Sequence, residues 1–159
     1  MMPSRKLRAA PARPRKGFSE LRWSPKLRRF VGTARVASLG TADRAACPHV
    51  VPICFVLSGN TIYSALDSKP KRLAARNLRR LRNIIENSQV AVLVHRYSED
   101  WEQLAYVLVR GHASLARAGE AQRATRLLRR KYSQYRKMPL TGRPIIKILL
   151  TSAYAWGAF

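Results

Sequence analysis

The strongest constraint on the fold is a pair of β-prone segments joined by a turn too short for anything but a hairpin. Residues 50–57 are rich in β-branched side chains, and the β-prone residues 61–66 follow after only Ser58-Gly59-Asn60. Such residues favour extended backbone, and a short turn containing Gly and Asn favours antiparallel return of the chain. Pro52 lacks a backbone donor, so it predicts an edge position or a bulge in the first segment.

The rest of the chain supplies four further predicted strands, three helices and one long loop. The strands are expected at 35–41, 89–94, 104–115 and 145–156, the helices at 24–32, 71–86 and 119–133, and the loop at 134–143. Ser24-Pro25 is a typical N-cap with proline at the first helical position, and Gly111 predicts a bulge. Six mainly antiparallel strands with short helices predict a mainly β fold with some α, a small closed barrel. A doubly wound sheet would need helices between most strands.

Size and charge limit the class of protein. A chain of 159 residues with 47% hydrophobic residues can bury the core of one domain. Lys and Arg number 31 against 8 Asp and Glu, giving a net charge of +23. This excess predicts an anionic partner: nucleic acid, a phosphate-bearing cofactor or an anionic membrane surface.

The sequence has no apolar run of about 18 residues, which argues against a membrane-spanning helix. Two cysteines and three isolated histidines predict no metal site.

The basic residues are concentrated at the start of the chain. Residues 1–35 hold eleven Lys and Arg and one acid, and residues 1–17 hold three prolines and almost no large apolar side chain. Such a segment cannot offset its ordering entropy by burial. We therefore expect a disordered basic tail at 1–20 and a single domain at 21–159. The tail lacks the apolar region of a secretory signal, and we expect a cytoplasmic protein.

The segment with the clearest chemical character is 63–71. A predicted strand leads into a loop that holds Lys69 and Lys71 on either side of Pro70, and a predicted helix begins at once, with arginines at 72, 76, 79, 80 and 82. Helix N-termini offer free N–H groups and partial positive charge to anions. One interpretation is therefore a phosphate-binding cradle. The other is a basic helix face in contact with solvent, and the residues alone leave both open.

Several short segments occur in an order and spacing typical of a known family. They are residues 34–41, 48–55, 63–71, 82–84 with 87 and 90, 99–101, 109–111 and 131–136. Together they resemble the flavin- and deazaflavin-binding split-barrel proteins of the pyridoxamine-phosphate-oxidase-like class. The subgroup that they resemble most closely depends on coenzyme F-420. The resemblance covers roughly residues 25–157.

This resemblance implies a six-stranded antiparallel split β-barrel (the FMN-binding split barrel) that forms a homodimer, with cofactor bound in clefts between the two barrels. The residues that it assigns to the cofactor phosphate and acidic tail are Lys69, Lys71, Arg80 and Asn83. Those that it assigns to the ring system are Pro52, Cys54, Ser64 and, from the other subunit, Trp101.

The activity that the resemblance implies is hydride transfer between coenzyme F-420 and a small organic substrate, with FMN as the alternative cofactor. Coenzyme F-420 carries a phosphodiester and a polyglutamate tail, so a long cationic surface suits it well. Because the cofactor itself supplies the hydride chemistry, no catalytic residue is assigned. Tyr63 and Tyr106 are candidate proton donors by residue type alone.

The sequence departs from the family pattern at two places. The hairpin at 43–48 lacks the usual Asp-Gly turn, and residues 104–107 lack the tryptophans of closer relatives, so the substrate pocket is not inferred.

The alternative functions are a non-enzymatic cofactor carrier and a nucleic-acid-binding basic protein. Against nucleic acid, the basic residues are mostly not interleaved with aromatic residues, and no helix-turn-helix, zinc-finger or RNP motif occurs.

Overall fold

The structure, a computed structural model, describes residues 19–21, 23–66 and 78–159. Its strands are β1 (Ser19–Glu20), β2 (Ala37–Ala42), β3 (Pro48–Ile53), β4 (Val56–Ser58), β5 (Thr61–Ala65), β6 (Gln89–Arg96), β7 (Ala105–Leu115) and β8 (Ile145–Gly157). Its helices are α1 (Pro25–Thr33), α2 (Arg79–Glu86), the 3-10 turn η2 (Trp101–Gln103), α3 (Ala118–Lys131) and α4 (Gln134–Lys137). None of the helices in these ranges is long and apolar enough to cross a lipid bilayer.

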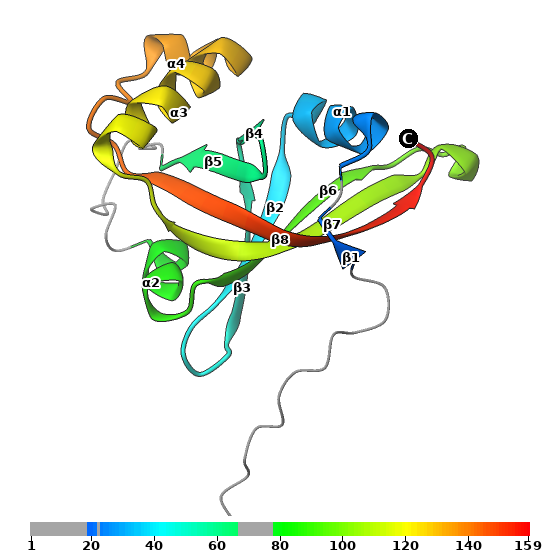
Figure 1. The fold of residues 1–159 in the computed structure, drawn as a ribbon, viewed down its shortest axis with the longest axis horizontal. Coiled ribbons are helices and arrows are strands. Elements are labelled where there is room, and N and C mark those ends of the chain that lie inside the picture. The colour runs from blue at the N-terminus through cyan, green and yellow to red at the C-terminus, as the bar shows by residue number, and fades with distance from the viewer. Residues whose placement is uncertain (1–18, 22, 67–77) are drawn as a thin grey trace, which may run out of the picture.

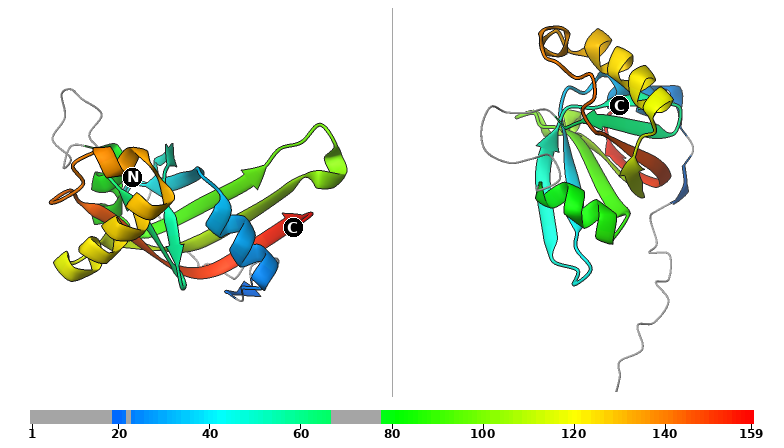
Figure 2. Two further views of the ribbon diagram at one scale, coloured as in Figure 1. Left: turned by 90° about the horizontal axis from the view of Figure 1, so that it is seen from above. Right: turned by 90° about the vertical axis from the view of Figure 1, so that its left-hand side faces the viewer.

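The strands form one antiparallel sheet that curls on itself (Figure 1). The order is β3-β2-β6-β7-β8-β5-β4, and β1 adds to β8. Within the described ranges no ladder joins β3 to β4, so the barrel is split rather than closed, and its strands number eight rather than the predicted six. The left view of Figure 2 agrees with Figure 1 in placing α3 and α4 at one end of the sheet, away from the C-terminus. The predicted mainly β, antiparallel split-barrel fold is confirmed.

The prediction of one continuous strand over residues 50–57 is wrong. β3 ends at Ile53, β4 begins at Val56, and the two strands lie at opposite ends of the sheet. Phe55 forms the corner between them: its N–H donates to the Tyr132 hydroxyl at 2.9 Å, and that hydroxyl donates toward the Phe55 carbonyl at 2.8 Å. Because the corner is itself buried and apolar, the sequence pattern does not distinguish it from a strand.

The turn and cap signals are confirmed. Ser58 lies opposite Thr61 in the β4–β5 hairpin, and Gly59 has a positive φ of 60°. Ser24 caps α1 by accepting a hydrogen bond from the Leu27 N–H at 3.2 Å. The β7–β8 register shifts between Arg110 and Gly111, as expected for a bulge. Pro52 lies in β3, which is an edge strand.

Three further segments differ from the predictions or are described only in part. The predicted loop at 134–143 contains the short helix α4. The predicted helix at 71–86 is seen as α2 from Arg79 onward, and its first part lies outside the described residues. Ser19 and Glu20, the last residues of the predicted tail, pair with Ala153 and Ser152 of β8, whereas residues 1–18 lie outside the described ranges.

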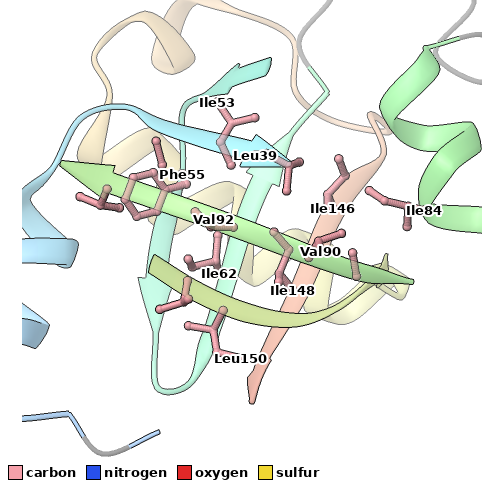
Figure 3. Close-up of a cluster of buried hydrophobic side chains, with 14 of the residues drawn as sticks. Leu39, Ile53, Phe55, Ile62, Ile84, Val90, Val92, Ile146, Ile148 and Leu150 are labelled. Atoms are coloured by element: carbon pink, nitrogen blue, oxygen red, sulfur yellow. The ribbon is translucent and has the colours of Figure 1, made fainter. Parts of the chain in front are cut away.

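Two apolar clusters fill the molecule. In the first, side chains from the inner face of the sheet point toward one another, among them Leu39, Val92 and Ile148 (Figure 3). The second lies between the sheet and α3 and includes Tyr63 and Leu128. Burial of such side chains is the main favourable term in folding. The first cluster uses the inner face of the sheet, and the second covers the part of the opposite face that lies beneath α3. The rest of the opposite face is left for other contacts.

Candidate functional site

The outward-pointing side chains of five neighbouring strands form a broad surface that we call the outer face. The strand register places Pro52, Ser38, Leu93, Leu108 and Tyr154 side by side across β3, β2, β6, β7 and β8. We define the outer face by these residues together with Val50, Gly40, Ala91, Tyr106 and Trp156.

Much of the outer face is apolar and open to solvent. Val50 is 65% exposed and Trp156 is 48% exposed, and the other members are half-buried or exposed. Single exposed apolar residues are common, but a contiguous group of them marks an interface or a ligand-binding surface. The outer face is therefore the candidate functional site.

Tyr106 lies within an aromatic cluster on this face. Its ring centroid is 5.8 Å from that of Tyr154 and 5.8 Å from that of Trp156. Desolvation raises the pKa of Tyr106, and the charge and hydrogen bond of Tyr154 raise it further. The phenol of Tyr106 is protonated at neutral pH, as that of an ordinary tyrosine is, and the raised pKa makes it a weaker acid.

Tyr63, the other candidate proton donor, has a different position. It is buried beneath α3, where its hydroxyl donates to Glu120 Oε1 at 2.7 Å and accepts from Arg123 at 3.3 Å. Hydrogen bonds from Tyr63 and Lys147 lower the pKa of Glu120. The Tyr63 hydroxyl is thus occupied in a polar contact away from the outer face.

The helix α2 carries two of the residues that the family resemblance assigns to the cofactor. It packs against β2 and β3. Asn83 is only 2% exposed, and its amide donates to Thr41 Oγ1 at 3.0 Å, so it fixes the helix on β2. Arg80 has a buried Nε with no hydrogen-bond acceptor among the described residues.

The start of α2 has the features of an anion site. Leu78 occupies the N-cap position and provides no side-chain cap. Arg79 forms an ion pair with Asp43 at 3.2 Å, whereas the buried Nε of Arg80 has no acceptor in the described part of the chain. Helix N–H groups beside a guanidinium whose Nε is buried are suited to a phosphate or carboxylate oxygen.

The three predicted ring-lining residues are separated by the fold. Pro52 is exposed on the outer face. Cys54 follows β3 as a partly buried free thiol that packs against the second apolar cluster. Ser64 is 2% exposed and lies on the same side of β5 as the core residue Ile62. Only Pro52 of the three therefore lies on the outer face.

Trp101 lies in the connection between β6 and β7, at the start of η2. The ring is 76% exposed, and Asp100 caps the turn by accepting a hydrogen bond from the Glu102 N–H at 3.1 Å. This exposure leaves the indole free to contact another molecule. Lys69 and Lys71 lie outside the described residues, so their predicted role stays a prediction.

Lys131 is an unusual cation that was not selected from the sequence. Its Nζ is buried without an acceptor among the described residues and lies 4.2 Å from the centroid of the Phe55 ring. Burial and, to a smaller extent, the Arg35 charge lower the pKa of Lys131 to about 8, against an opposing effect of Cys54. The available signal was its helical spacing from the buried residues Ala124 and Leu128.

Comparison with models of protein families shows which family the chain belongs to. A family model described as pyridoxamine 5'-phosphate oxidase matches residues 24–157. The chain belongs to the pyridoxamine 5'-phosphate oxidase family. The match runs from the N-cap of α1 to the end of β8, so it includes the whole outer face. A search among curated proteins gave no match.

Solved structures show the pyridoxamine 5'-phosphate oxidase fold in proteins with different names. A conserved hypothetical protein from Mycobacterium tuberculosis has a TM-score of 0.67 and 16% identity, over 92% of this chain and 90% of that one. A FAD-binding protein from Mesorhizobium loti has a TM-score of 0.61 and 18% identity, over 88% and 99%. The heme-storage protein HutZ from Vibrio cholerae has a TM-score of 0.61 and 13% identity, over 82% and 91%. At these identities the likeness establishes the fold.

Proposed function

We propose that this member of the pyridoxamine 5'-phosphate oxidase family is a homodimeric oxidoreductase that transfers hydride between coenzyme F-420 and a small organic molecule. FMN is the alternative cofactor. The observation that carries the proposal is the outer face, a broad exposed apolar and aromatic surface on a chain of this family.

A planar heterocyclic ring fits such a surface. Small-molecule sites are mostly apolar, with a few polar groups that fix orientation. One outer face covers only one side of a ring, whereas a second copy of the chain related by two-fold symmetry would cover the other. The exposed Trp101 in the β6–β7 connection would then contact the ring system from the partner subunit, as the family resemblance implies.

The phosphate end of the cofactor would lie at α2. The buried Nε–H of Arg80 has no acceptor in the described ranges, which is costly, and a phosphate or carboxylate oxygen at Arg80 would remove that cost. The net charge of +23 favours the cofactor with more negative charge, which is coenzyme F-420. Lys69 and Lys71 would add cations if the predicted cradle forms.

The chain's own residues would bind the cofactor, orient its ring and donate a proton in the reaction. When bound, a flavin or deazaflavin supplies the hydride chemistry itself. Arg80 would anchor the anionic end, and the outer face would exclude water from the ring. Tyr106 lies in the aromatic cluster of the outer face, whereas the hydroxyl of the buried Tyr63 is bonded to Glu120, so of the two tyrosine candidates Tyr106 is the one placed to donate a proton on this face.

A non-enzymatic carrier is the second candidate. One protein of the same fold is named as a heme-storage protein, so the fold also serves binding without a named reaction. A carrier would bind cofactor and turn over no substrate.

The deciding experiment measures cofactor binding by the full chain. Coenzyme F-420 and FMN are titrated separately, with fluorescence as the readout, and the oxidation of reduced F-420 is then followed with a panel of organic acceptors. Arg80→Ala should raise the Kd by about tenfold, since a charge-assisted contact is lost. Arg82→Ala is the matched control, because it removes an exposed arginine from the same helix.

The outcomes separate the alternatives. Binding with turnover supports the oxidoreductase, and binding without turnover with any acceptor supports the carrier. Equal weakening by both arginine variants would mean a general electrostatic field rather than a site. Absence of binding for both cofactors would overturn the proposal, and a salt-sensitive affinity for nucleic acid in that case would point to the basic-protein alternative.

A further inference from the structure

A second concave surface lies between α3 and the turn that precedes β8. We call it the α3 groove and define it by Leu115, Arg126, Arg129, Leu140, Arg143 and Ile145. Its volume is about 670 Å³, which is within the usual range for small-molecule sites. It shares no residue with the outer face or with α2.

The floor of the groove is apolar. Leu140 and Ile145 are fully buried at its base, and the neighbouring Ala116 and Ala121 also line it. Leu115 lies at the edge and is 44% exposed. An exposed leucine beside a concave apolar floor offers contact area to an apolar ligand and gains by being covered.

Two walls of the groove carry cations. Arg126 and Arg129 are three residues apart on α3, so they lie on one side of the helix. Arg143 comes from the opposite wall, and the lining residues that the structure describes include no Asp or Glu. Glu120, on the same helix, is already bonded to Tyr63 at 2.7 Å and Lys147 at 2.9 Å, so its charge is compensated elsewhere.

The two walls are held in place by hydrogen bonds to backbone carbonyls. The Arg143 N–H donates to the Leu140 carbonyl at 3.1 Å across a turn in which Gly142 has a φ of 74°. The Ala116 N–H donates to the Ile145 carbonyl at 2.9 Å. Arg129 Nε donates to the Tyr135 carbonyl at 3.2 Å, which fixes that guanidinium at the wall. The groove is therefore largely preformed, which lowers the cost of binding.

We propose that the α3 groove binds a small organic anion made of an apolar body and one carboxylate, sulfonate or phosphate head. The body covers Leu115 and the apolar floor, and the head lies between Arg126 and Arg143. Arginine on both sides of the opening selects an anionic head, and the apolar floor selects against small inorganic anions.

The test uses anilinonaphthalene sulfonate, a fluorescent aromatic anion, with the full chain. The double substitution Arg126→Ala and Arg143→Ala should raise the Kd of this probe by about tenfold or more. Arg130→Ala is the matched control, because it removes an exposed arginine of the same helix that does not line the groove. Dodecanoate should displace the probe at a concentration at least about tenfold lower than dodecanol, which lacks the charge.

A filling variant makes the test independent of charge. Thr125→Trp places a large ring in the groove and leaves the three arginines intact, so it should abolish probe binding, with the thermal unfolding midpoint measured to verify folding. Unchanged probe binding in the double and filling variants would place the probe outside the α3 groove and overturn the proposal. Equal displacement by dodecanoate and dodecanol would also overturn it. The double variant Arg126→Ala, Arg143→Ala should give the same cofactor titration as the native chain. The test of the α3 groove is therefore independent of the test of the proposed function.

Discussion

At the scale of single residues, Lys131 shows how a cation behaves when burial removes water from it and the described part of the chain supplies no hydrogen-bond acceptor. Its amine faces the rings of Phe55 and Tyr132, at 4.2 and 5.5 Å from their centroids. Cation–π contact offsets part of the desolvation cost. Burial nevertheless lowers the pKa of Lys131 from its ordinary value of 10.5 to about 8. The charged form is therefore a source of instability in the folded state.

This shift predicts a stability that rises with pH. Between about pH 8 and 10.5 the unfolded chain holds the Lys131 proton more tightly than the folded chain, so unfolding becomes less favourable as pH rises through that window. Lys131→Met should remove this rise. At pH 7 it should stabilise the fold by about 1 kcal/mol, a value reduced from the full shift because the side chain is partly solvated.

The measurement is denaturant unfolding at pH 7 and pH 9.5. Lys137→Met is the control, because Lys137 is exposed at the end of α4. A native chain and a Lys131→Met variant with the same pH dependence would contradict the burial argument.

At the scale of elements, the long strands β7 and β8 depend on one bulge. The register between them shifts at Gly111, and a Cβ at that position would collide with the carbonyl of Leu149. Local sequence identified this site correctly, because only glycine allows such close approach of two backbones. The curl of the sheet follows, since bulges bend and twist the strand that carries them.

Gly111→Ala should destabilise the protein by about 2 kcal/mol, since backbone atoms must move to admit the methyl group. Gly119→Ala, near the start of α3, has open space around the added Cβ and should be neutral or stabilise by about 0.5 kcal/mol. Thermal unfolding of both variants distinguishes the two sites, and equal midpoints would show that the bulge tolerates a side chain.

At the scale of the whole molecule, the apolar outer face requires a cover. Leu93, Leu108 and Tyr154 form one row on it, and the single chain leaves this row half-exposed. The proposed second copy would bury the row and complete the cofactor site. Under this proposal, formation of the dimer and binding of the cofactor depend on each other.

Leu108→Arg should convert the proposed dimer to monomer and abolish cofactor binding together, because it places a charge in the middle of the outer face. Leu115→Arg is the control, since it adds the same charge at an exposed position outside that face. Light scattering gives the mass, and fluorescence titration gives the binding. A Leu108→Arg variant that remains dimeric would place the dimer interface elsewhere.

The site could be predicted less completely than the fold. The family resemblance correctly led to the split barrel, and it named Arg80, whose buried Nε suits an anion. Asn83 and Ser64 were assigned to the cofactor, and that assignment stays a prediction; the structure adds that both are buried, at 2% exposure each. Helical spacing alone does not show which face of α2 meets the sheet, because that depends on Thr41, a residue far away in the chain.

Sequence by itself determined the features that depend on neighbours along the chain: the cap at Ser24, the turn at Gly59, the edge position of Pro52 and the bulge at Gly111. Backbone sterics and local hydrogen bonding act over a few residues, so the sequence carries them directly. Only tertiary structure decided that residues 50–57 break at Phe55 and that Lys131 turns inward. Both depend on Tyr132 and the packing of α3, since burial is a property of contacts between distant segments.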